Sequence, residues 1–484
     1  MGRLARVSAS NDPSDQHFDL VVIGGGPGGY GTALYGASAG LNVALVEFDK
    51  IGGTCLHRGC IPAKELLETA AIVRTVKHAG EFGVVVEPKS LDWSVTLERK
   101  QSVIDKLAGG VTGLLKGRQV TIFNGVGTLG ADRTVSIRGV DGESATITAD
   151  AVVLASGSVP RLIPGFESDG RTVVTSDEFF QIERVPRRAV VIGGGAIGCE
   201  FASTLADLGA TVTILEALPK VLPGCDEDVT RTVLQAFKKK GIEVRTGVSV
   251  RGHRGAGSGE GGVGTVVEFG EGETIETDLV VVSVGRVPFT DGLLADGTGV
   301  RVGERGHIEV DERCRTGEPS VWALGDAIAT PQLAHVAFAE GILAVKDLLG
   351  ESPAPIDYQK VPWAIYCSPE VAFAGHSEAS AKEAGFDVVV SKHRFAGNSR
   401  AMIIGETAGL VKIIAERNAD GTGGRILGVH MVGPWVTEQL SGGYLAVNWE
   451  ATVDEVAEFI QPHPSLTELF GESVLALTGR SLHG

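Results

Sequence analysis

The order of apolar and polar residues repeats one pattern at two places in the chain. In the segments Leu20–Glu47 and Val190–Glu216, an apolar strand runs into a glycine-rich turn, followed by a helical stretch and a second apolar strand. Both segments contain the same strand-to-turn sequence, Val-Val-Ile-Gly-Gly-Gly, and both end on an acidic residue. Apolar strands that alternate with helices are typical of a parallel sheet covered by helices. The pattern therefore predicts an α/β fold with two similar strand–helix–strand units.

The glycine spacing in both turns is that of a Rossmann-like dinucleotide-binding unit. Each turn reads Gly-x-Gly-x-x-Gly, and an acid, Glu47 or Glu216, follows the first glycine by 23 residues. Such glycines permit close backbone approach, so a pyrophosphate can lie at the helix N-terminus while the acid binds a ribose diol. One such motif is weak evidence for a bound dinucleotide, but two in the same strand–turn–helix context are strong evidence. The alternative is that both are glycine turns of an α/β fold that bind no nucleotide. The glycines are Gly24, Gly26 and Gly29 in the first unit and Gly193, Gly195 and Gly198 in the second.

The same kind of pattern predicts further elements. Residues 91–117 have helical periodicity, whereas 120–155 contain short strands, the last of them at Ala151–Leu154. The strand Val321–Leu324 is followed by a glycine and Asp326, which places this acid at the carboxyl end of a strand, where α/β proteins bind ligands. Glycine-containing turns are expected at Gly125, Gly127, Gly130 and residues 141–142, and a flexible hairpin tip is expected at 253–264.

Length and charge restrict the class of protein. A chain of 484 residues is too long for one hydrophobic core, so about three domains are expected. The net charge of −17 argues against nucleic acid or an anionic membrane surface as the main partner. No apolar stretch approaches the length of a membrane span, and the polar N-terminal residues do not form a signal peptide. We therefore expect a soluble, cytoplasmic protein that does not insert into a membrane.

The stretch Gly52–Lys64 carries the most specific chemistry in the chain. It contains Cys55 and Cys60, five positions apart, at the entrance to a helix predicted over residues 63–78. The positive end of the helix dipole and the nearby cation of Lys64 would stabilise a thiolate at Cys60. This arrangement favours two sulfurs that cycle between a dithiol and a disulfide.

Three other interpretations of the cysteine pair were weighed. A structural disulfide is rare in intracellular proteins, and a zinc site would need more ligands than His57 supplies. Two unrelated core cysteines are also possible, because free cysteine often packs as a small apolar residue. No metal site is predicted. The other cysteines have no pattern and are interpreted as packing residues: Cys199, Cys225, Cys314 and Cys367.

Two nucleotide units and a redox-active cysteine pair together suggest an electron relay. A nicotinamide would exchange a hydride with a flavin, and the flavin would exchange electrons with the sulfurs. Because the cysteines directly follow the first glycine motif, we expect FAD at the first unit and NAD at the second. Glu216 would repel the 2′-phosphate of NADP, and the residues that follow it, 217–219, include no arginine.

A candidate base lies near the C-terminus. A dithiol substrate must lose protons near neutral pH, and histidine is the side chain whose pKa suits that task. His463 stands between two prolines, and Glu468 begins a predicted helix from which it could orient the imidazole. A histidine between prolines is more often a solvated loop residue, but the sulfur chemistry elsewhere in the chain favours catalysis. The third domain must then fold back to the sulfurs or deliver His463 from a second subunit.

After residue 17, almost the whole chain resembles the flavin-dependent pyridine nucleotide–disulfide oxidoreductases. Within that family it is most similar to the members that oxidise dihydrolipoamide. The matching segments are 26–30, 52–64, 195–200, 285–288, 323–326, 333–335, 366–372 and 463–468.

The resemblance implies a role for each residue of the site. Cys60 would face the flavin and Cys55 would exchange with the substrate, while Lys64 would pair with Glu200 beside the flavin. Lys50, Asp326 and Ala334 would contact FAD. The other residues implied to bind the cofactors, besides the glycines and acids of the two motifs, are Gly127, Ser156, Gly157, Gly285 and Arg286.

The resemblance also implies an activity and an assembly. The activity is NAD-dependent oxidation of protein-bound dihydrolipoamide to lipoamide through a Cys55–Cys60 disulfide and FAD. The enzyme would be a homodimer in which His463, oriented by Glu468, serves the site of the other subunit. Its partners would be the lipoyl-bearing E2 of a 2-oxoacid dehydrogenase complex or the carrier protein of glycine cleavage.

Two other function classes were considered. A reductase for glutathione, mycothiol or mercuric ion is disfavoured, because Glu216 opposes NADPH and the residues 479–484 contain no cysteine for a mercuric site. A non-catalytic flavoprotein assembly subunit would have no use for the cysteines and the histidine. Some residues differ from the usual family pattern, namely Ser156, Phe289 and the pair His57 and Arg58, whose positive charge could shift the redox potential.

These expectations divide the chain into five segments. Residues 1–17 are a disordered tail, and 18–157 form the first part of an FAD-binding domain. An NAD-binding domain covers 158–285, and 286–356 complete the FAD-binding domain. The composition changes at about residue 357, so 357–484 are expected to form an α+β interface domain that makes the dimer.

Overall fold

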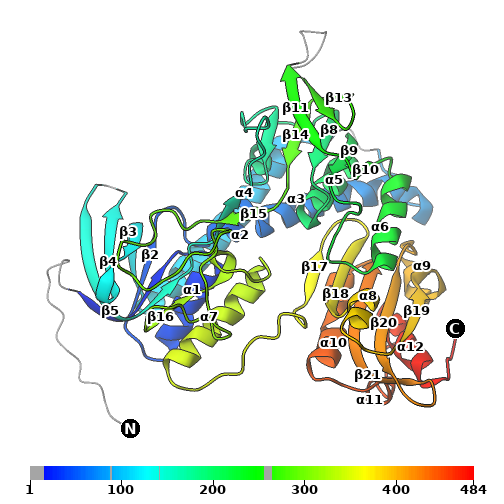
Figure 1. The fold of residues 1–484 in the computed structure, drawn as a ribbon. Coiled ribbons are helices and arrows are strands. Elements are labelled where there is room, and N and C mark those ends of the chain that lie inside the picture. The colour runs from blue at the N-terminus through cyan, green and yellow to red at the C-terminus, as the bar shows by residue number, and fades with distance from the viewer. Residues whose placement is uncertain (1–15, 88–89, 141, 256–263, 484) are drawn as a thin grey trace. The chain divides into compact units, whose positions relative to one another are not determined.

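The computed structural model describes residues 16–87, 90–140, 142–255 and 264–483, and its elements are labelled in Figure 1. Most of the expected tail, the expected turn at residue 141 and the centre of the expected hairpin tip lie outside these described residues. The chain divides into two compact units. The first comprises Met1–Pro62, Leu97–Arg161 and Arg286–Ile356, and the second comprises Ala63–Thr96, Leu162–Gly285 and Asp357–Gly484. The finer division into nucleotide and interface domains stays a prediction.

The first unit is built on a six-stranded sheet. Its elements are β1 (His17–Ile23), β2 (Val43–Glu47), β3 (Thr121–Leu129), β4 (Thr134–Gly139), β5 (Ser144–Leu154), β16 (Val321–Ala323), α1 (Pro27–Ser38) and α7 (Ala334–Leu348). Strand β1 pairs in parallel with β2 and β5, and the parallel order continues to β3 on one side and β16 on the other. Strand β4 pairs antiparallel with β3 and β5. The central strands therefore have the parallel α/β arrangement that the apolar pattern predicts.

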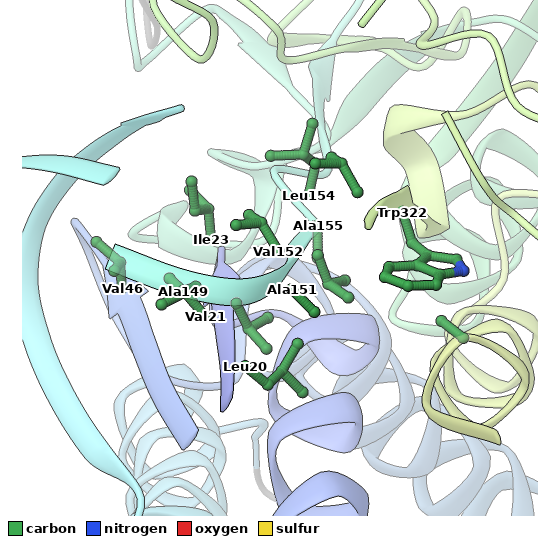
Figure 2. Packing of buried hydrophobic residues seen from close by; sticks show 14 of the residues in the cluster. Leu20, Val21, Ile23, Val46, Ala149, Ala151, Val152, Leu154, Ala155 and Trp322 are labelled. Atoms are coloured by element: carbon green, nitrogen blue, oxygen red, sulfur yellow. The ribbon is translucent and has the colours of Figure 1, made fainter. Parts of the chain in front are cut away.

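The core of the first unit lies around the central strands (Figure 2). Leu20, Val21, Val152 and Leu154 are fully buried, and Trp322 of β16 is 6% exposed. A strand that is buried on both faces has continuous apolar residues, which explains the Val-Val-Ile runs in the sequence. Each such side chain contributes roughly 1.5–3 kcal/mol when it is fully buried. This core fixes the carboxyl ends of β1 and β5, where the site begins.

Two turns predicted from glycines are wrong. Gly125 and Gly127 lie inside β3, whereas Gly130 does end that strand as predicted. A Cβ at Gly125 would stand 2.6 Å from the carbonyl oxygen of Arg138 in β4, and one at Gly127 would stand 3.0 Å from a methyl group of Val46. These glycines therefore permit close packing within the sheet, a second use of glycine in strands that the sequence pattern does not distinguish from a turn.

Three helices follow the first nucleotide unit, namely α2 (Gly53–Arg58), α3 (Cys60–His78) and α4 (Trp93–Gly117). Helix α4 confirms the helix predicted over 91–117. The predicted helix after the cysteines begins three residues earlier than expected, at Cys60, and Pro62 lies in its first turn as predicted. Helix α2 was not predicted, because it is too short to show helical periodicity. Among the described residues, none of the helices combines the length and the apolar character that crossing a membrane requires.

The nucleotide part of the second unit has a five-stranded parallel sheet in the order β10-β9-β8-β14-β7. Its elements are β7 (Val173–Thr175), β8 (Arg188–Ile192), β9 (Thr211–Glu216), β10 (Glu243–Thr246), β14 (Leu279–Val282), α5 (Ala196–Asp207) and α6 (Glu227–Lys239). A separate antiparallel sheet contains β11 (Val250–Gly255), β12 (Thr265–Phe269) and β13 (Glu273–Thr277). The strand, helix and strand of the second glycine motif are thus β8, α5 and β9.

The C-terminal part of the second unit is an antiparallel sheet with helices, as expected for an α+β segment. The strands, in the order β17-β18-β21-β20-β19, are β17 (Trp363–Ile365), β18 (Glu370–Gly375), β19 (Val388–Arg394), β20 (Leu410–Arg417) and β21 (Gly423–Gly433). The helices are α8 (Glu378–Glu383), α9 (Ser399–Ile403), α10 (Val436–Asn448), α11 (Val453–Ala457) and α12 (Glu468–Leu475). Helix α12 begins at Glu468, as predicted.

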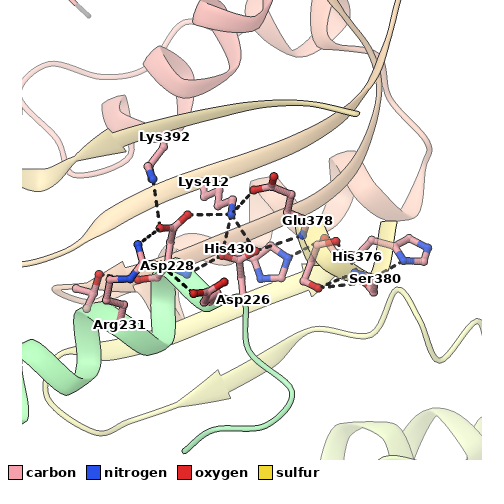
Figure 3. Close-up of polar contacts among 12 residues, drawn as sticks. Asp226, Asp228, Arg231, His376, Glu378, Ser380, Lys392, Lys412 and His430 are labelled. Atoms are coloured by element: carbon pink, nitrogen blue, oxygen red, sulfur yellow. Dashed lines mark hydrogen bonds and ion pairs between the residues drawn. The ribbon is translucent and has the colours of Figure 1, made fainter. Parts of the chain in front are cut away.

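A buried ammonium group joins helix α6 to the C-terminal sheet within the second unit (Figure 3). The Nζ atom of Lys412, on β20, lies 2.9 Å from a carboxylate oxygen of Asp226, 2.9 Å from one of Asp228 and 2.8 Å from one of Glu378. Burial alone would lower the pKa of Lys412, but hydrogen bonds to the three carboxylates raise it above its ordinary value. The side chain therefore stays charged, and it fixes the N-terminus of α6, where Asp226 is the N-cap residue.

We expect Lys412→Met to lower the free energy of unfolding by about 3–5 kcal/mol, because it removes one partner of a buried ionic cluster. The Lys412 and Asp226 side chains are only 3% and 2% exposed. The matched control is Lys382→Met, which removes a 59% exposed cation from Glu378 and should change the free energy of unfolding by about 0–1 kcal/mol. Urea unfolding of both variants measures the difference. Equal losses would contradict a special role for the buried ammonium.

Candidate active site

The turn from β1 into α1 brings two backbone segments into close contact. Gly24 has a left-handed φ of 106°, and a Cβ there would stand 2.2 Å from the carbonyl oxygen of Ala155. A Cβ at Gly29 would stand 1.7 Å from the carbonyl oxygen of Gly24. Only glycine fits at both positions, so α1 begins directly at the end of the strand.

The carboxylate of Glu47 closes the same turn. One oxygen accepts a hydrogen bond from the Gly25 N–H at 2.6 Å, and the other accepts one from the Asp49 N–H at 2.7 Å. Burial raises the pKa of Glu47 above its ordinary value, although these hydrogen bonds act in the opposite direction. A carboxylate offers about four acceptor positions, so both oxygens keep capacity for the hydroxyls of a ribose.

The second glycine motif repeats this geometry atom for atom. Gly193 has a φ of 104°, and a Cβ at Gly198 would stand 1.9 Å from the Gly193 carbonyl oxygen. The two oxygens of Glu216 accept hydrogen bonds from the Gly194 N–H at 2.5 Å and the Leu218 N–H at 2.7 Å. The internal repeat predicted from the sequence is therefore also a repeat of hydrogen bonds.

Both motif helices begin without a side-chain cap among the described residues, and their N-cap residues are Gly26 and Gly195. A Cβ at either position would meet no atom of the described residues within 4 Å. Each helix N-terminus thus offers free N–H groups and the positive end of its dipole to open space. This cradle fits a pyrophosphate group.

The loop after β5 holds a polar atom that fits a bound cofactor. The Oγ atom of Ser156 is buried and has no hydrogen-bond partner among the described residues. Gly157 follows in left-handed backbone, with a φ of 75°. A buried hydroxyl without a partner is costly, so its position beside the first glycine cradle suits a ligand that supplies the partner. The residues of the first unit therefore fit FAD.

A hydrogen-bonded chain connects the predicted cofactor residues Asp326 and Arg286. The Ser158 hydroxyl donates to Asp326 at 2.5 Å, and the Arg286 guanidinium donates to the Ser158 hydroxyl and carbonyl oxygens, each at 2.8 Å. The same guanidinium lies 3.4 Å from the Thr54 hydroxyl, next to Cys55. These residues come from β6 (Ser158–Pro160) and β15 (Arg286–Pro288), which pair antiparallel.

The remaining predicted cofactor residues occupy four different places. Lys50 is exposed in the loop between β2 and α2, and Ala334 is the first residue of α7. Gly285 precedes β15 with a φ of 99°, and Gly127 packs inside β3 against Val46.

Cys55 and Cys60 form a disulfide. Their Cα atoms are 4.6 Å apart, within the usual range for a disulfide. Cys55 lies in the first turn of α2, and Cys60 is the first residue of α3. Both residues are partly exposed, so a substrate or a flavin can reach sulfurs at this position. A thiolate at Cys60 would be stabilised by the N-terminus of α3.

The other cysteines fit the packing role predicted for them. All four are buried, and burial raises the pKa of Cys199, Cys225 and Cys367 above that of an ordinary thiol. Such thiols stay protonated and unreactive. Among the described residues there is no group of three or more His, Cys, Asp or Glu side chains placed to hold a metal ion.

The positive charge between the two cysteines is largely compensated. Arg58 donates to the Asp49 carboxylate at 2.6 Å, and His57 Nε2 lies 2.9 Å from the Ile51 carbonyl oxygen. The expected effect of Arg58 on the redox potential is therefore smaller than an unpaired cation would give.

Lys64 and Glu200 form the pair that the family resemblance implies. The Lys64 ammonium lies 2.9 Å from each oxygen of the Glu200 carboxylate, whose side chain is 7% exposed. Lys64 comes from the first half of α3 and Glu200 from α5, so the pair fixes the redox helix to the second motif helix within the second unit.

His463 and Glu468 form a second pair. The Nδ1 atom of His463 lies 2.7 Å from Glu468, and the other oxygen of that carboxylate accepts a hydrogen bond from the Ser465 N–H at 2.7 Å. Burial alone would raise the pKa of Glu468, but the hydrogen bonds from Ser465 and His463 lower it below its ordinary value. An ionised carboxylate cannot donate, so Nδ1 carries the proton and Nε2 is left as the acceptor.

Sequence reasoning missed two residues of the site. Ser158 connects Asp326 to Arg286, and Tyr366 contacts the Lys64–Glu200 pair. The sequence offers one weak indication of a role for Ser158, which is that it directly follows the predicted cofactor-binding residues Ser156 and Gly157. Tyr366 lies in a segment that resembles the family, but its sequence separation from Lys64 concealed the contact.

Comparison with protein families supports these geometric findings. Residues 18–341 match the model described as pyridine nucleotide-disulphide oxidoreductase, and residues 361–474 match the dimerisation domain of the same family. The crystal structure of LpdA from Mycobacterium tuberculosis superimposes with a TM-score of 0.88 at 26% sequence identity, over 96% of this chain and 99% of that one.

Characterised relatives are similar over nearly their whole length. The dihydrolipoyl dehydrogenase of Bacillus subtilis (strain 168) is 41% identical over 474 residues, which cover 96% of this chain and 99% of the relative. The dihydrolipoyl dehydrogenase of Chlamydia muridarum is 37% identical over 97% of this chain and 98% of its own. The two glycine cradles, the disulfide and these matches together show that the chain belongs to the pyridine nucleotide–disulphide oxidoreductase family.

Proposed function

We propose that the protein is a homodimeric flavoprotein that oxidises protein-bound dihydrolipoamide to lipoamide, with NAD⁺ as the final electron acceptor. The observation that carries this proposal is the Cys55–Cys60 disulfide at the start of α3, in a chain with two intact nucleotide cradles. Full-length relatives named dihydrolipoyl dehydrogenase support the choice of substrate.

The two sulfurs have different roles in this proposal. A thiolate of dihydrolipoamide attacks Sγ of Cys55, which forms a mixed disulfide and releases Cys60 as a thiolate. The second substrate thiol, once deprotonated, attacks the substrate sulfur of the mixed disulfide, so lipoamide leaves and Cys55 is released as a thiolate. Two electrons then remain on the protein dithiol. The N-terminus of α3 favours Cys60 as the leaving thiolate in the first step.

The first unit would hold FAD and the second NAD. When bound, the flavin supplies two-electron transfer between the dithiol and the nicotinamide. Glu47 would bind the ribose of FAD, the N-terminus of α1 its pyrophosphate, and the Ser156 hydroxyl would gain the partner it lacks among the described residues. Other residues proposed to line the FAD site are Gly24, Gly26, Gly29, Lys50, Gly127, Gly157, Asp326 and Ala334. Those proposed for NAD are Gly193, Gly195, Gly198, Glu216 and Gly285. Arg286 is proposed to bind a cofactor from its place beside Ser158 and Asp326 in the first unit.

His463 is the proposed base. Its Nε2 atom would accept the proton of the substrate thiol, and the Glu468 carboxylate would stabilise the imidazolium that forms. Its side chain is 72% exposed within its own unit, which suits a group that completes the site of the other subunit.

The dimer is supported by the family's dimerisation domain and by apolar side chains close to this base in sequence. Trp449, Phe459 and Ile460 are 74%, 72% and 95% exposed. Large exposed apolar groups of this kind are typical of a protein interface. A lipoyl-bearing E2 component or the carrier protein of glycine cleavage is the proposed partner, and a cytoplasmic location stays a prediction.

The first test of the proposal is a comparison of substrates. We expect oxidation of dihydrolipoamide with NAD⁺ to be faster than reduction of glutathione disulfide or mycothiol disulfide with NADPH, because Glu216 would repel the 2′-phosphate of NADPH. Steady-state kcat/KM for each pair measures the preference. A higher kcat/KM for either disulfide with NADPH would identify the protein as a reductase instead.

The second test addresses Cys55. We expect Cys55→Ser to abolish lipoamide turnover while FAD stays bound, because Cys60 alone cannot form the disulfide that the substrate opens. Cys314→Ala is the matched control, since this cysteine is 1% exposed in the core of the first unit and should leave turnover intact. Turnover and the flavin absorbance of purified protein are the measurements. If the Cys55→Ser variant still turned over lipoamide, Cys55 would not be the cysteine that exchanges with the substrate.

The third test addresses His463. We expect His463→Gln to give a folded dimer whose lipoamide kcat is about 10²–10⁴-fold lower, the usual contribution of a positioned general base. His483→Gln removes a similar exposed imidazole, which lies 3.0 Å from Glu472, and should leave kcat unchanged. If His463→Gln and His483→Gln lowered kcat by the same modest factor, another residue would have to be the base.

A further inference from the structure

The ammonium of Lys64 has a second partner besides Glu200. It lies 4.6 Å from the centroid of the Tyr366 ring, within the distance at which a cation is attracted to an aromatic face. The backbone N–H of Tyr366 also donates to a Glu200 oxygen at 2.8 Å. One residue therefore contacts both members of the charged pair, the cation through its ring and the carboxylate through its backbone.

The segment around Tyr366 is itself fixed to helix α5. It follows β17, and two residues later the Ser368 N–H donates to the Ser203 hydroxyl at 3.0 Å. Ser203 is fully buried and lies three residues after Glu200, on the neighbouring position of the helix surface. Two hydrogen bonds thus hold the C-terminal segment against α5 and keep the Tyr366 ring in place over Lys64.

The phenol of Tyr366 remains neutral at this position. Burial raises its pKa above the ordinary value, and the nearby carboxylates of Glu438 and Glu370 raise it further, while a hydrogen bond with Thr437 acts in the opposite direction. A neutral ring presents its electron-rich face to the ammonium. The Lys64 side chain is 35% exposed, so part of its charge stays available to a bound group.

We infer that Tyr366 is a positioning residue that holds the Lys64 cation for the flavin, and that its aromatic face thereby helps to set the flavin reduction potential. The inference rests on the proposed function, in which the flavin takes electrons from the Cys55–Cys60 dithiol. Lys64 lies one helical turn after Cys60 on the same face of α3, so its cation is close to this reaction. A cation near a reduced flavin stabilises its negative charge, so reduction becomes more favourable. Loss of the ring would free Lys64 to move or to pair differently, and this stabilisation would weaken. The flavin environment would then depend on a residue of the C-terminal segment.

The test is the reduction equilibrium of the flavin in the purified dimer, measured against a redox dye. We expect Tyr366→Leu to lower the equilibrium constant for flavin reduction severalfold, and by no more than the roughly thirtyfold that corresponds to loss of a whole cation–π contact. Tyr366→Phe is the matched control, because it keeps the ring and removes only the hydroxyl. It should stay within about twofold of the parent protein.

A double-mutant cycle shows whether the effect passes through Lys64. In a Lys64→Met background, Tyr366→Leu should cause no further change in the reduction equilibrium. An equal change in both backgrounds, or none in the parent, would overturn the inference. Because Tyr366→Leu could impair folding, replacement of Tyr366 by pentafluorophenylalanine provides a second variant with nearly the same shape. This ring has a reversed quadrupole, so it should lower the equilibrium constant as Tyr366→Leu does.

The inference and the proposed function can fail separately. If the parent protein binds FAD but does not oxidise dihydrolipoamide, the substrate assignment fails, while coupled effects of Tyr366 and Lys64 on the flavin would still support the inference. If the parent oxidises dihydrolipoamide and the two residues are uncoupled, only the inference fails.

Discussion

The constraint on which the rest of the structure depends is the contact between backbones at the two glycine turns. A side chain at Gly29 or Gly198 would stand less than 2 Å from a carbonyl oxygen of the preceding strand end, at 1.7 Å and 1.9 Å. With glycine there, each helix starts directly over the end of its strand, and its first N–H groups remain free for a ligand. The acids Glu47 and Glu216 then hold the turn by accepting backbone hydrogen bonds from both of its sides. The disulfide Cys55–Cys60 follows the first of these turns and lies in the same compact unit.

Both units have the same glycine turn held by an acid, but they differ in the loop beside this turn, which follows β5 in the first unit and β14 in the second. In the first unit, the buried Ser156 hydroxyl in the loop after β5 has no partner among the described residues, whereas the corresponding residue in the loop after β14 is the apolar Val284. The loop of the first cradle therefore needs a ligand that bonds to a hydroxyl at this place, whereas that of the second has no hydroxyl to satisfy there. Strands β6 and β15, which follow the two glycine-motif repeats in the sequence, pair with each other within the first unit, so that Ser158 and Arg286 meet beside Asp326. The two repeats therefore differ in their surroundings, and this difference supports the proposal that the flavin binds at the first of them.

The elements that could be predicted well from the sequence are those determined by residues close to one another in the chain. Apolar runs, glycine spacing and a matching acid all act within one strand–helix–strand unit, so the cradles, the start of α12 at Glu468 and the His463 contact could be predicted from neighbouring residues. The wrong or missing predictions arose where distant segments meet or where an element is too short to show a pattern. Gly125 serves packing against β4 instead of a turn, and helix α2 is too short to show a period. The contact of Tyr366 with Lys64 was missed for the same reason, because nothing in either segment alone indicates the other.

Charge compensation is the common feature of the residues around the redox chemistry. Arg58 is paired with Asp49, Lys64 with Glu200 and His463 with Glu468, and each pair places the carboxylate where it is less exposed than its cation. A paired cation contributes less to the potential of a nearby sulfur or flavin than an isolated one, so its position relative to its carboxylate matters more than its presence. The unusual His57–Arg58 sequence therefore shifts the potential less than its charge suggests, because Asp49 on the loop after β2 holds the arginine. The inferred effect of the neutral Tyr366 on the flavin follows from the same reasoning, because its ring fixes where the Lys64 charge lies.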